Sequence, residues 1–326
     1  MTLPNRSHLL TEQRNPRTMN LHKLSVADLV RTIRREDETV LTAMATAEPA
    51  LSAFLEEAEP RFIAGGRLIY LGAGTSGRLA VLDASEAPPT FDVPPGRVIG
   101  IIAGGDAALR TPVEGAEDNY NGAAPELNKL NLTSLDTVIA IAAGGTTPYA
   151  LGALEHTKLT SPQTLRALIT CTPLPPTDAP PDDAHSVPPW DSTDDPKTHL
   201  LLLPTGPEVI TGSTRMKAGT ATKRALNIIS TTLMIRDGRV HENLMVELRA
   251  TNDKLRDRAA RIIATLTGLD RDASLRTLEE ADGEVKTAIV MHKHQLDAET
   301  ARQHLKTHNN RLEMALQRQP DAPTND

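Results

Sequence analysis

The sequence has little of several features that would assign a protein to a class at once. It holds a single cysteine, Cys171, which excludes an internal disulfide framework and any metal site with several cysteine ligands. No apolar run approaches the length of a membrane span. An excess of positive charge is also absent: the net charge is -7, so binding to nucleic acid has no electrostatic support. Aromatic residues make up only 2% of the chain, so the core must consist mainly of aliphatic side chains.

The features that are present are ordinary for a folded protein. A chain of 326 residues, 39% hydrophobic and 24% charged, is long enough for one large or two modest domains with a core. The polar N-terminus carries arginines without an apolar segment, so it lacks the pattern of a secretory signal. Glu12, Pro4 and Pro16 disfavour a mitochondrial presequence. We expect a cytoplasmic protein that binds neither nucleic acid nor a membrane, with a flexible N-terminus over residues 1–21.

The central part of the chain has the pattern of a parallel sheet. Helical spacing predicts N-terminal helices over residues 22–66, interrupted at Glu48-Pro49. Apolar runs with little alternation then predict five strands buried on both faces: Arg67–Leu71, Arg97–Ile102, Thr137–Ala142, Leu165–Cys171 and His199–Leu203. Intervening segments such as Leu109–Leu130 and Pro148–Leu159 are long enough for crossover helices. The expected fold is a doubly wound α/β protein with a parallel five-stranded sheet flanked by helices, and with helical N-terminal and C-terminal segments.

The predicted domains follow from these patterns. The sheet domain is expected over residues 67–266, and a small C-terminal helical region over residues 267–326. A stretch rich in proline and aspartate, residues 172–197, interrupts the sheet domain and predicts a surface insertion that cannot pack into a core. The single tryptophan, Trp190, lies within it.

A glycine-rich turn after the first strand is the strongest functional motif. The string Gly72-Ala73-Gly74-Thr75-Ser76-Gly77 stands between a strand and a helix, where backbone amides and the helix N-terminus bind anions. It also matches the dinucleotide fingerprint, but Asp106 is a late match for the acidic residue that this fingerprint requires. Hydroxyls at Thr75 and Ser76, with Arg78 close by, suit a terminal phosphate better. A sugar phosphate is therefore favoured over a nucleotide, and a purely structural turn is the third interpretation.

Three further clusters follow the other predicted strands or precede helices. One contains Glu114 and Glu117, the second is Ala143–Tyr149, and the third is Glu208–Thr220. In isolation Glu86 and Glu117 would be surface carboxylates. The pair His292 and His294 points to different faces of a helix, which disfavours a metal site.

Taken together, the clusters closely resemble the N-acetylmuramic acid 6-phosphate etherase family, whose members have the sugar isomerase (SIS) fold. The matching strings are Leu68–Leu79, Leu82–Glu86, Val113–Asp118, Gly212–Thr220, Gly238–Val240, Asn243–Val246, Ala250–Leu255 and Lys286–Met291. Several of them are long and specific to the family, and together they extend over nearly the whole chain.

The resemblance implies a lyase that needs no metal or other cofactor. Its substrate would be a sugar 6-phosphate whose D-lactyl ether at carbon 3 is eliminated after a base removes the carbon-2 proton, and water would then add. By motif match, Glu86 takes the proton-donor position and Glu117 the other catalytic position, plausible as the base. Which glutamate is acid and which is base stays open. Burial and a nearby phosphate would raise both pKa values into a useful range.

The resemblance also implies the binding residues and the oligomeric state. Gly74, Thr75, Ser76 and Gly77 would hold the phosphate. Contributions from Ser213, Thr214 and Lys217 are expected, across the interface of a homodimer.

One cluster departs from the family pattern. The family usually has Ala-Ser-Gly-Arg-Thr-Pro-Tyr where this chain has Ala143-Gly144-Gly145-Thr146-Thr147-Pro148-Tyr149, so a hydroxyl and a guanidinium are missing. The loss of one charge-assisted contact to phosphate would cost about 1.5–3 kcal/mol. The departure keeps a second hypothesis open, a non-catalytic sugar-phosphate sensor resembling the glucokinase regulatory protein. A sugar-phosphate aldose–ketose isomerase is the third hypothesis, and a nicotinamide dehydrogenase a distant fourth.

Overall fold

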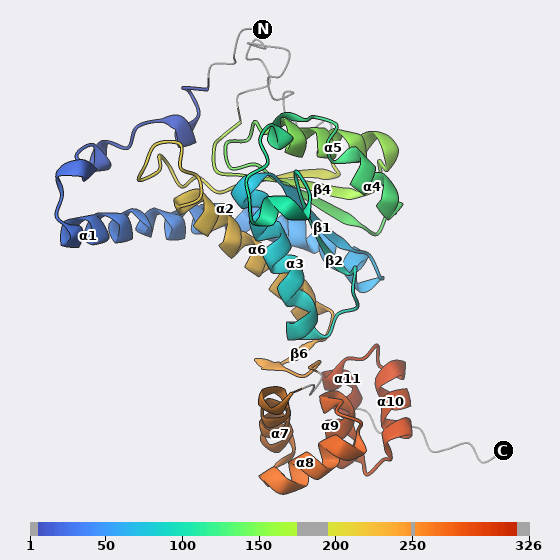
Figure 1. Ribbon diagram of the computed structural model, residues 1–326. Coiled ribbons are helices and arrows are strands. Elements are labelled where there is room, and N and C mark those ends of the chain that lie inside the picture. Colours follow the sequence, from blue (N-terminus) through green and yellow to red (C-terminus); the bar gives the residue numbers. More distant parts are fainter. Residues whose placement is uncertain (1–5, 175–194, 249–251, 318–326) are drawn as a thin grey trace. The chain divides into compact units, whose positions relative to one another are not determined.

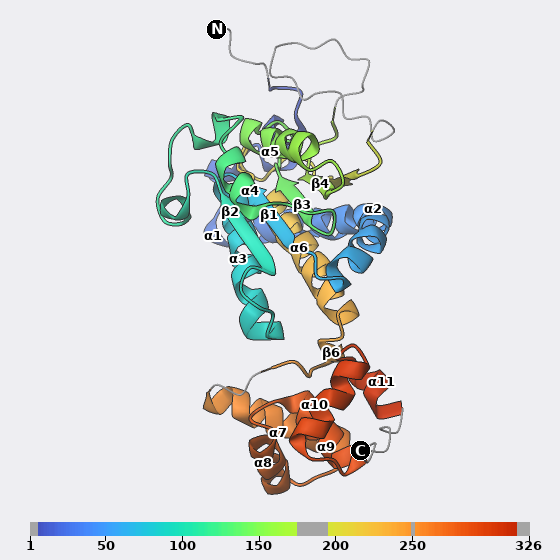
Figure 2. The same cartoon turned by 90° about the vertical axis from the view of Figure 1, so that its right-hand side faces the viewer.

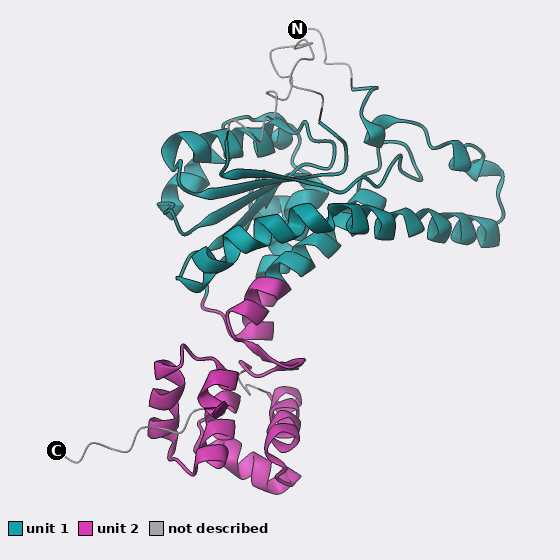
Figure 3. Cartoon of the chain, turned by 180° about the vertical axis from the view of Figure 1, so that it is seen from behind, with its two compact units in different colours: residues 1–85, 95–230 teal, residues 86–94, 231–326 magenta. Residues whose placement is uncertain are grey.

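The computed structural model describes three stretches of the chain, residues 6–174, 195–248 and 252–317. Most of the predicted insertion, including Trp190, lies outside them. The chain divides into two compact units, drawn in different colours in Figure 3: residues 1–85 with 95–230, and residues 86–94 with 231–326. The domain boundary expected between 266 and 267 falls inside the second unit.

The first unit is built on a parallel sheet with the strand order β2-β1-β3-β4-β5 (Figure 1). Its strands are β1 (Leu68–Gly72), β2 (Val98–Ile102), β3 (Thr137–Ile141), β4 (Leu165–Thr170) and β5 (Thr198–Leu202). Each was predicted to within one residue at either end, because buried apolar runs bounded by polar loops mark parallel strands clearly. The chain runs from β1 to β2 on one side and then crosses back to β3 on the other side of β1. A ligand site is expected at the carboxyl ends of β1 and β3, where the direction switches.

Helices cover both faces of this sheet. The α-helices that begin in the first unit are α1 (Val26–Glu36), α2 (Glu38–Ile63), α3 (Gly74–Phe91), α4 (Ala124–Leu130), α5 (Pro148–Thr160) and α6 (Lys217–Arg236). Figures 1 and 2 show α4 and α5 over one face and α2 and α6 over the other. Between α5 and the sheet, aliphatic side chains such as Leu71, Val138 and Leu154 form a buried core. The doubly wound fold that the sequence predicted is confirmed.

The helix break expected at Glu48-Pro49 is wrong. Helix α2 continues through both Pro49 and Pro60, and the actual break is at Asp37, between α1 and α2. The apolar face on which Met44, Leu51 and Phe54 are buried continues across Pro49. Packing of that face therefore offsets the hydrogen bond that the proline cannot donate.

The N-terminal segment is more structured than the expected flexible N-terminus. Its described part contains three 3-10 helices, at Leu10–Glu12, Pro16–Thr18 and Leu21–Lys23. The Gly212 amide donates to the Thr11 carbonyl oxygen at 2.9 Å, and the Thr18 hydroxyl donates to the Val209 carbonyl oxygen at 2.9 Å. The segment is thus attached to a loop about two hundred residues later in the sequence.

The second unit is helical, as expected for the C-terminal region. After a short hairpin, β6 (Val240–His241) and β7 (Leu244–Met245), it consists of α7 (Asp253–Thr267), α8 (Arg271–Glu280), α9 (Val285–His294), α10 (Ala298–Thr307) and α11 (Leu312–Gln317). Helix α9 is buried along Val285–Met291 and forms the centre of this unit's core. Among the described helices, none has the length and apolar character that crossing a membrane would require.

Candidate active site

The glycine-rich turn connects β1 to the first turn of α3. Gly74 begins the helix with a positive φ of 53°, a conformation that glycine adopts without strain. The first amides of a helix have no partner within the helix and carry the positive end of its dipole. The structure therefore has the strand, glycine-rich turn and helix in the order that the motif predicted, with the N-terminus of α3 at the turn.

Gly77 lies where α3 packs closely against β1 and β2. A Cβ atom at this position would lie 2.5 Å from the Gly72 carbonyl oxygen and 2.5 Å from Ile102 Cγ1. Only glycine therefore allows α3 to approach β1 and β2 this closely. Gly77 was predicted to bind phosphate, but it is not among the described residues that line the neighbouring pocket.

A pocket of about 270 Å³ lies at this end of the first unit. Its walls come from five segments that are far apart in the sequence: Arg6, Leu9, Thr11 and Glu12; Ala73, Gly74, Thr75, Ser76 and Leu79; Glu117 and Asp118; Ala143, Gly144, Thr146, Thr147 and Pro148; Gly212, Thr214, Gly219 and Thr222. The size suits a ligand of the class of a monosaccharide phosphate, somewhat smaller than a typical drug site.

Partial positive charge and hydroxyl groups converge on this pocket. Both α3 and α5 begin at its wall, with Gly74 and Pro148 as their first residues, so two helix N-termini face the same space. Thr75, Ser76, Thr147 and several other threonines add hydroxyl donors around them. This arrangement fits a ligand that carries a phosphate group and several hydroxyls.

One of the two predicted catalytic glutamates lines the pocket. Glu117 lies in the short 3-10 helix Ala116–Asp118, which follows Gly115 in a left-handed conformation. Glu86 lies on α3, in a part of that helix that belongs to the second unit, and it is not among the described residues of the pocket wall. Both side chains are exposed in the single chain, so the burial expected around them is not seen.

Only some of the predicted binding residues lie in the pocket wall. Gly74, Thr75, Ser76 and Thr214 line the pocket, whereas Ser213 and Lys217 are not among its described wall residues. Lys217 is fully buried, and its ammonium group donates to Glu36 Oε2 at 3.1 Å. Arg78, the cation of the glycine turn, instead donates to the carbonyl oxygens of Ala108 and Leu109. Both cations thus have partners within the protein, which spacing in the sequence does not reveal.

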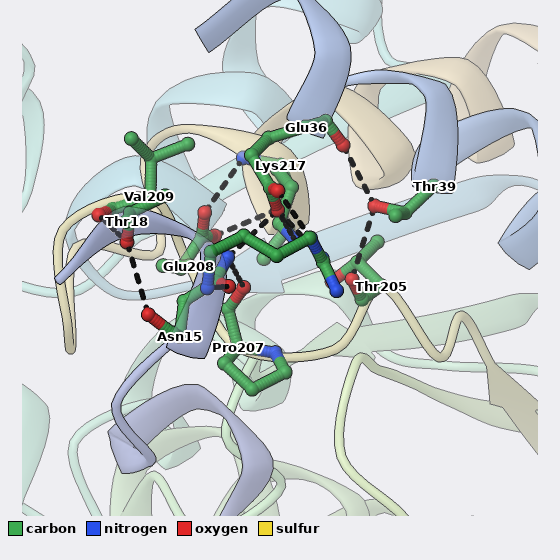
Figure 4. A network of polar contacts seen from close by, with 11 residues as sticks. Asn15, Thr18, Glu36, Thr39, Thr205, Pro207, Glu208, Val209 and Lys217 are labelled. Carbon is green, nitrogen blue, oxygen red and sulfur yellow. Dashed lines mark hydrogen bonds and ion pairs between the residues drawn. The ribbon is translucent and has the colours of Figure 1, made fainter. Parts of the chain in front are cut away.

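Lys217 belongs to a network that attaches the N-terminal segment to the start of α6 (Figure 4). Asn15 Nδ2 donates to Glu36 Oε2 at 2.7 Å, and Arg17 Nη2 donates to the same oxygen at 2.8 Å. The Glu208 carboxylate accepts the backbone amides of Lys217 and Ala218 at 3.0 and 2.9 Å, and so caps α6.

Charge and burial set the pKa values in this network. Hydrogen bonds from Arg17, Asn15 and Lys217 lower the pKa of Glu36 to about 2, although its burial acts in the opposite direction. Burial raises the pKa of Glu208, against the effect of the two amides. Glu36 is therefore the fixed negative charge that holds the network together.

The N-terminal wall of the pocket was not predicted from the sequence. Arg6, Leu9, Thr11 and Glu12 fall in the segment that was expected to be flexible. No local pattern marks these residues, because their position depends on hydrogen bonds to the distant loop at Val209–Gly212.

The cluster Ala143–Tyr149, which departs from the family pattern, also lines the pocket. A Cβ atom at Gly144 would lie 3.6 Å from Thr11 Oγ1 and 3.8 Å from Thr146 Oγ1, both ordinary contact distances. The pocket therefore has room at this point, and the wall is polar without a side chain at Gly144.

Known proteins are similar to this chain over different lengths of it. Residues 50–158 match the family model for the glucokinase regulatory protein N-terminal SIS domain. The chain is 46% identical to an N-acetylmuramic acid 6-phosphate etherase from Pectobacterium atrosepticum, over 94% of this chain and 96% of the relative. It is 45% identical to one from Erwinia tasmaniensis over 97% of both chains. Among solved structures, a phosphoheptose isomerase from Francisella tularensis aligns with a TM-score of 0.42 at 16% identity, over 65% of this chain and 98% of that chain.

Proposed function

The chain belongs to the N-acetylmuramic acid 6-phosphate etherase family, and on this premise we propose that it cleaves the D-lactyl ether of N-acetylmuramic acid 6-phosphate. The products are N-acetylglucosamine 6-phosphate and D-lactate, and the enzyme is a carbon–oxygen lyase of amino-sugar catabolism. The observation that carries the proposal is the pocket in which a phosphate-binding helix terminus and the Glu117 carboxylate share one cavity.

The reaction proceeds on the ring-opened sugar by elimination and then addition of water. A base removes the carbon-2 proton, which is acidified by the neighbouring aldehyde, and the bond between carbon 3 and the lactyl oxygen breaks. An acid protonates the departing lactate. Water then adds to carbon 3 of the unsaturated aldehyde, and carbon 2 takes up a proton from the enzyme or solvent. The chemistry needs one group that accepts a proton and one that donates it, and two carboxyl groups suffice.

Glu117 is proposed as one of these groups because it lines the pocket. Glu86 is proposed as the other because it stands in the family string Leu82–Glu86. The assignment of base and acid between them stays open. Gly74, Thr75 and Ser76 hold the phosphate at the start of α3, and Thr214, another residue of the pocket wall, contributes to its binding.

Exchange of Glu86 for alanine tests the motif-based part of this assignment. We expect kcat for lactate release to fall at least about 100-fold, since loss of an acid or base of this kind costs about 10²–10⁴-fold. The control is Glu56→Ala on α2, which removes another exposed carboxylate outside the pocket wall. If Glu86→Ala retains activity near that of the control, Glu86 has no role in the chemistry.

Incubation of the purified protein with N-acetylmuramic acid 6-phosphate, followed by enzymatic assay of D-lactate, tests the function itself. Multiple turnovers without added metal or nucleotide support the lyase. Tight binding of N-acetylglucosamine 6-phosphate without any lactate release would instead support the sensor hypothesis.

The proposal includes a cytoplasmic homodimer. Helix α1 carries Val26 and Val30, which are 78% and 63% exposed and lie one turn apart on the same face. Two exposed valines on one face of a helix support contact with a second copy of the chain.

Val30→Asp is expected to shift the protein from dimer to monomer in sedimentation velocity measurements, because it places a charge in the apolar contact. Leu159→Asp on α5 is the matched control, since Leu159 is 74% exposed and lies on a different helix. A wild-type protein that sediments as a monomer at high micromolar concentration would contradict the homodimer.

A further inference from the structure

The N-terminal segment contributes a hydroxyl and a cation to the pocket wall, and neither has a role in the proposed reaction. Residues Arg6 and Thr11 both line the cavity. Thr11 is held in place, because its carbonyl oxygen accepts the Gly212 amide at 2.9 Å. A few residues further on, the network around Asn15 and Glu36 fixes the segment to α6. This wall of the pocket is therefore attached to the fold at both ends of residues 11–15.

The Thr11 side chain is a buried part of the pocket wall. Thr11 is 1% exposed, and among the described residues no group forms a hydrogen bond with its buried Oγ1. A buried hydroxyl without a hydrogen-bond partner is unfavourable, and a ligand that accepts its proton removes this cost. The neighbouring wall at Gly144 leaves ordinary contact space beside it, since a Cβ atom there would be 3.6 Å from Oγ1. The hydroxyl is thus placed to donate to a ligand in the cavity.

Among the described residues of the pocket wall, Arg6 is the only lysine or arginine. Its guanidinium forms no ion pair within the described part of the chain. The remaining charged wall residues are the carboxylates Glu12, Glu117 and Asp118. A substrate with a phosphate and a carboxylate brings several negative charges toward these groups. The helix termini supply only partial positive charges, whereas Arg6 carries a full positive charge at the pocket wall.

We propose that Thr11 and Arg6 bind an anionic group of the sugar substrate and make the N-terminal segment a specificity-determining wall of the site. The shared chemistry is an anionic oxygen, of either the 6-phosphate or the lactyl carboxylate. Thr11 donates its O–H and Arg6 its guanidinium N–H groups. These are the same two chemical groups, a hydroxyl and a guanidinium, that the sequence lacks at Gly144 and Thr146. The inference rests on the proposed function for the identity of the substrate.

The variants Arg6→Ala and Thr11→Val test this inference, with Arg6→Lys and Thr11→Ser as the conservative pair. Arg35→Ala is the matched control, because Arg35 is an exposed arginine of α1 outside the pocket wall. Lactate release gives kcat and KM separately. Calorimetric titration gives the Kd of N-acetylglucosamine 6-phosphate and of unphosphorylated N-acetylmuramic acid, and thermal unfolding gives the stability of the free protein.

Arg6→Ala is expected to raise KM about 10- to 100-fold with little change in kcat, as for loss of a charge-assisted hydrogen bond. Thr11→Val is expected to raise KM about 10-fold and to leave the free protein at least as stable, because the hydroxyl is unpaired there. Thr11→Ser should recover most of the affinity, and Arg6→Lys a part of it. Weaker binding of N-acetylglucosamine 6-phosphate assigns the contact to the phosphate. An effect confined to N-acetylmuramic acid assigns it to the lactyl carboxylate.

An Arg6→Ala and a Thr11→Val enzyme that both keep the KM of the Arg35→Ala control would overturn the inference while leaving the lyase intact. Failure of the proposed function gives a different result from failure of this inference. If the wild type releases no lactate, yet binds N-acetylglucosamine 6-phosphate in a manner that depends on Arg6, the proposed function fails and the anion-binding wall stands.

Discussion

Replacement of Glu117 by glutamine is expected to lower kcat for lactate release about 10²–10⁴-fold, while the Kd of N-acetylglucosamine 6-phosphate changes little. Glutamine keeps the size and most hydrogen bonds of the side chain but neither accepts nor donates a proton at carbon 2 or at the leaving oxygen. The proposed phosphate ligands at the start of α3 and at Thr214 are other residues of the pocket wall, which the substitution leaves unchanged. A large effect on kcat with intact product binding is therefore the signature of a catalytic role.

The control for this experiment lies in the same loop. Glu114 is also exposed but is not among the described residues of the pocket wall, so Glu114→Gln should stay within about threefold of the wild type. Equal activity of the Glu117 and Glu114 variants would remove Glu117 from the mechanism. A parallel loss in both would indicate that the loop, and not one carboxylate, is what matters.

Removal of the Glu36 carboxylate is expected to be the most destabilising single exchange in the first unit. Glu36→Ala leaves the fully buried Lys217 ammonium group without its carboxylate partner. Breaking a buried pair in this way costs about 3–5 kcal/mol of the free energy of unfolding. Because Asn15 also donates to Glu36, the same exchange loosens the N-terminal wall of the pocket. Urea unfolding of the variant should show a correspondingly lower midpoint, and KM should rise.

Two comparisons make this prediction specific. Glu38→Ala removes a neighbouring carboxylate whose ion pair with Arg34 is exposed on both sides, so it should cost no more than about 1 kcal/mol. Glu36→Ala combined with Lys217→Met should recover part of the loss, since the unpaired charge is then gone. A Glu36→Ala protein as stable as the Glu38→Ala protein would contradict the buried network of Figure 4.

The pH dependence of stability has a defined sign at this site. The pKa of Glu36 is lowered from 4.5 to about 2 by hydrogen bonds from Arg17, Asn15 and Lys217. A carboxyl group with a lowered pKa in the folded state contributes stability that is complete above its unfolded pKa and is lost as the pH falls through the folded value. The wild type should therefore lose about 3 kcal/mol between pH 4.5 and pH 2 that the Glu36→Ala variant does not lose. Parallel curves for the two proteins would show that Glu36 carries no such linkage.

The sheet and the glycine-rich turn between β1 and α3 were predictable because both depend on local sequence. Five buried apolar runs located the strands, and Gly72-x-Gly74 located the turn. The uninterrupted α2 was not predictable in the same way. Its continuity through Pro49 depends on the tertiary packing of Leu51 and Phe54, which outweighs the local tendency of proline to end a helix.

The charged residues of the site show where sequence reasoning ends. Lys217 and Arg78 are cations at sequence positions where phosphate ligands are expected. Lys217 is instead paired with Glu36. Arg78 donates to two backbone carbonyl oxygens. Arg6 and Thr11 have no local motif, yet they line the pocket. The availability of a cation depends on partners that are distant in the sequence, as Lys217 and Glu36 are, and spacing does not encode them.

The most direct test of the central claim is the fate of the carbon-2 hydrogen during turnover in deuterated water. Elimination followed by addition of water must break the bond between carbon 2 and hydrogen, so the N-acetylglucosamine 6-phosphate formed should carry deuterium at carbon 2. Mass spectrometry and proton NMR of the isolated product measure this. One deuterium at carbon 2 for each lactate released is the predicted result. Release of lactate with the original hydrogen retained at carbon 2 would contradict proton abstraction by a carboxylate of this enzyme.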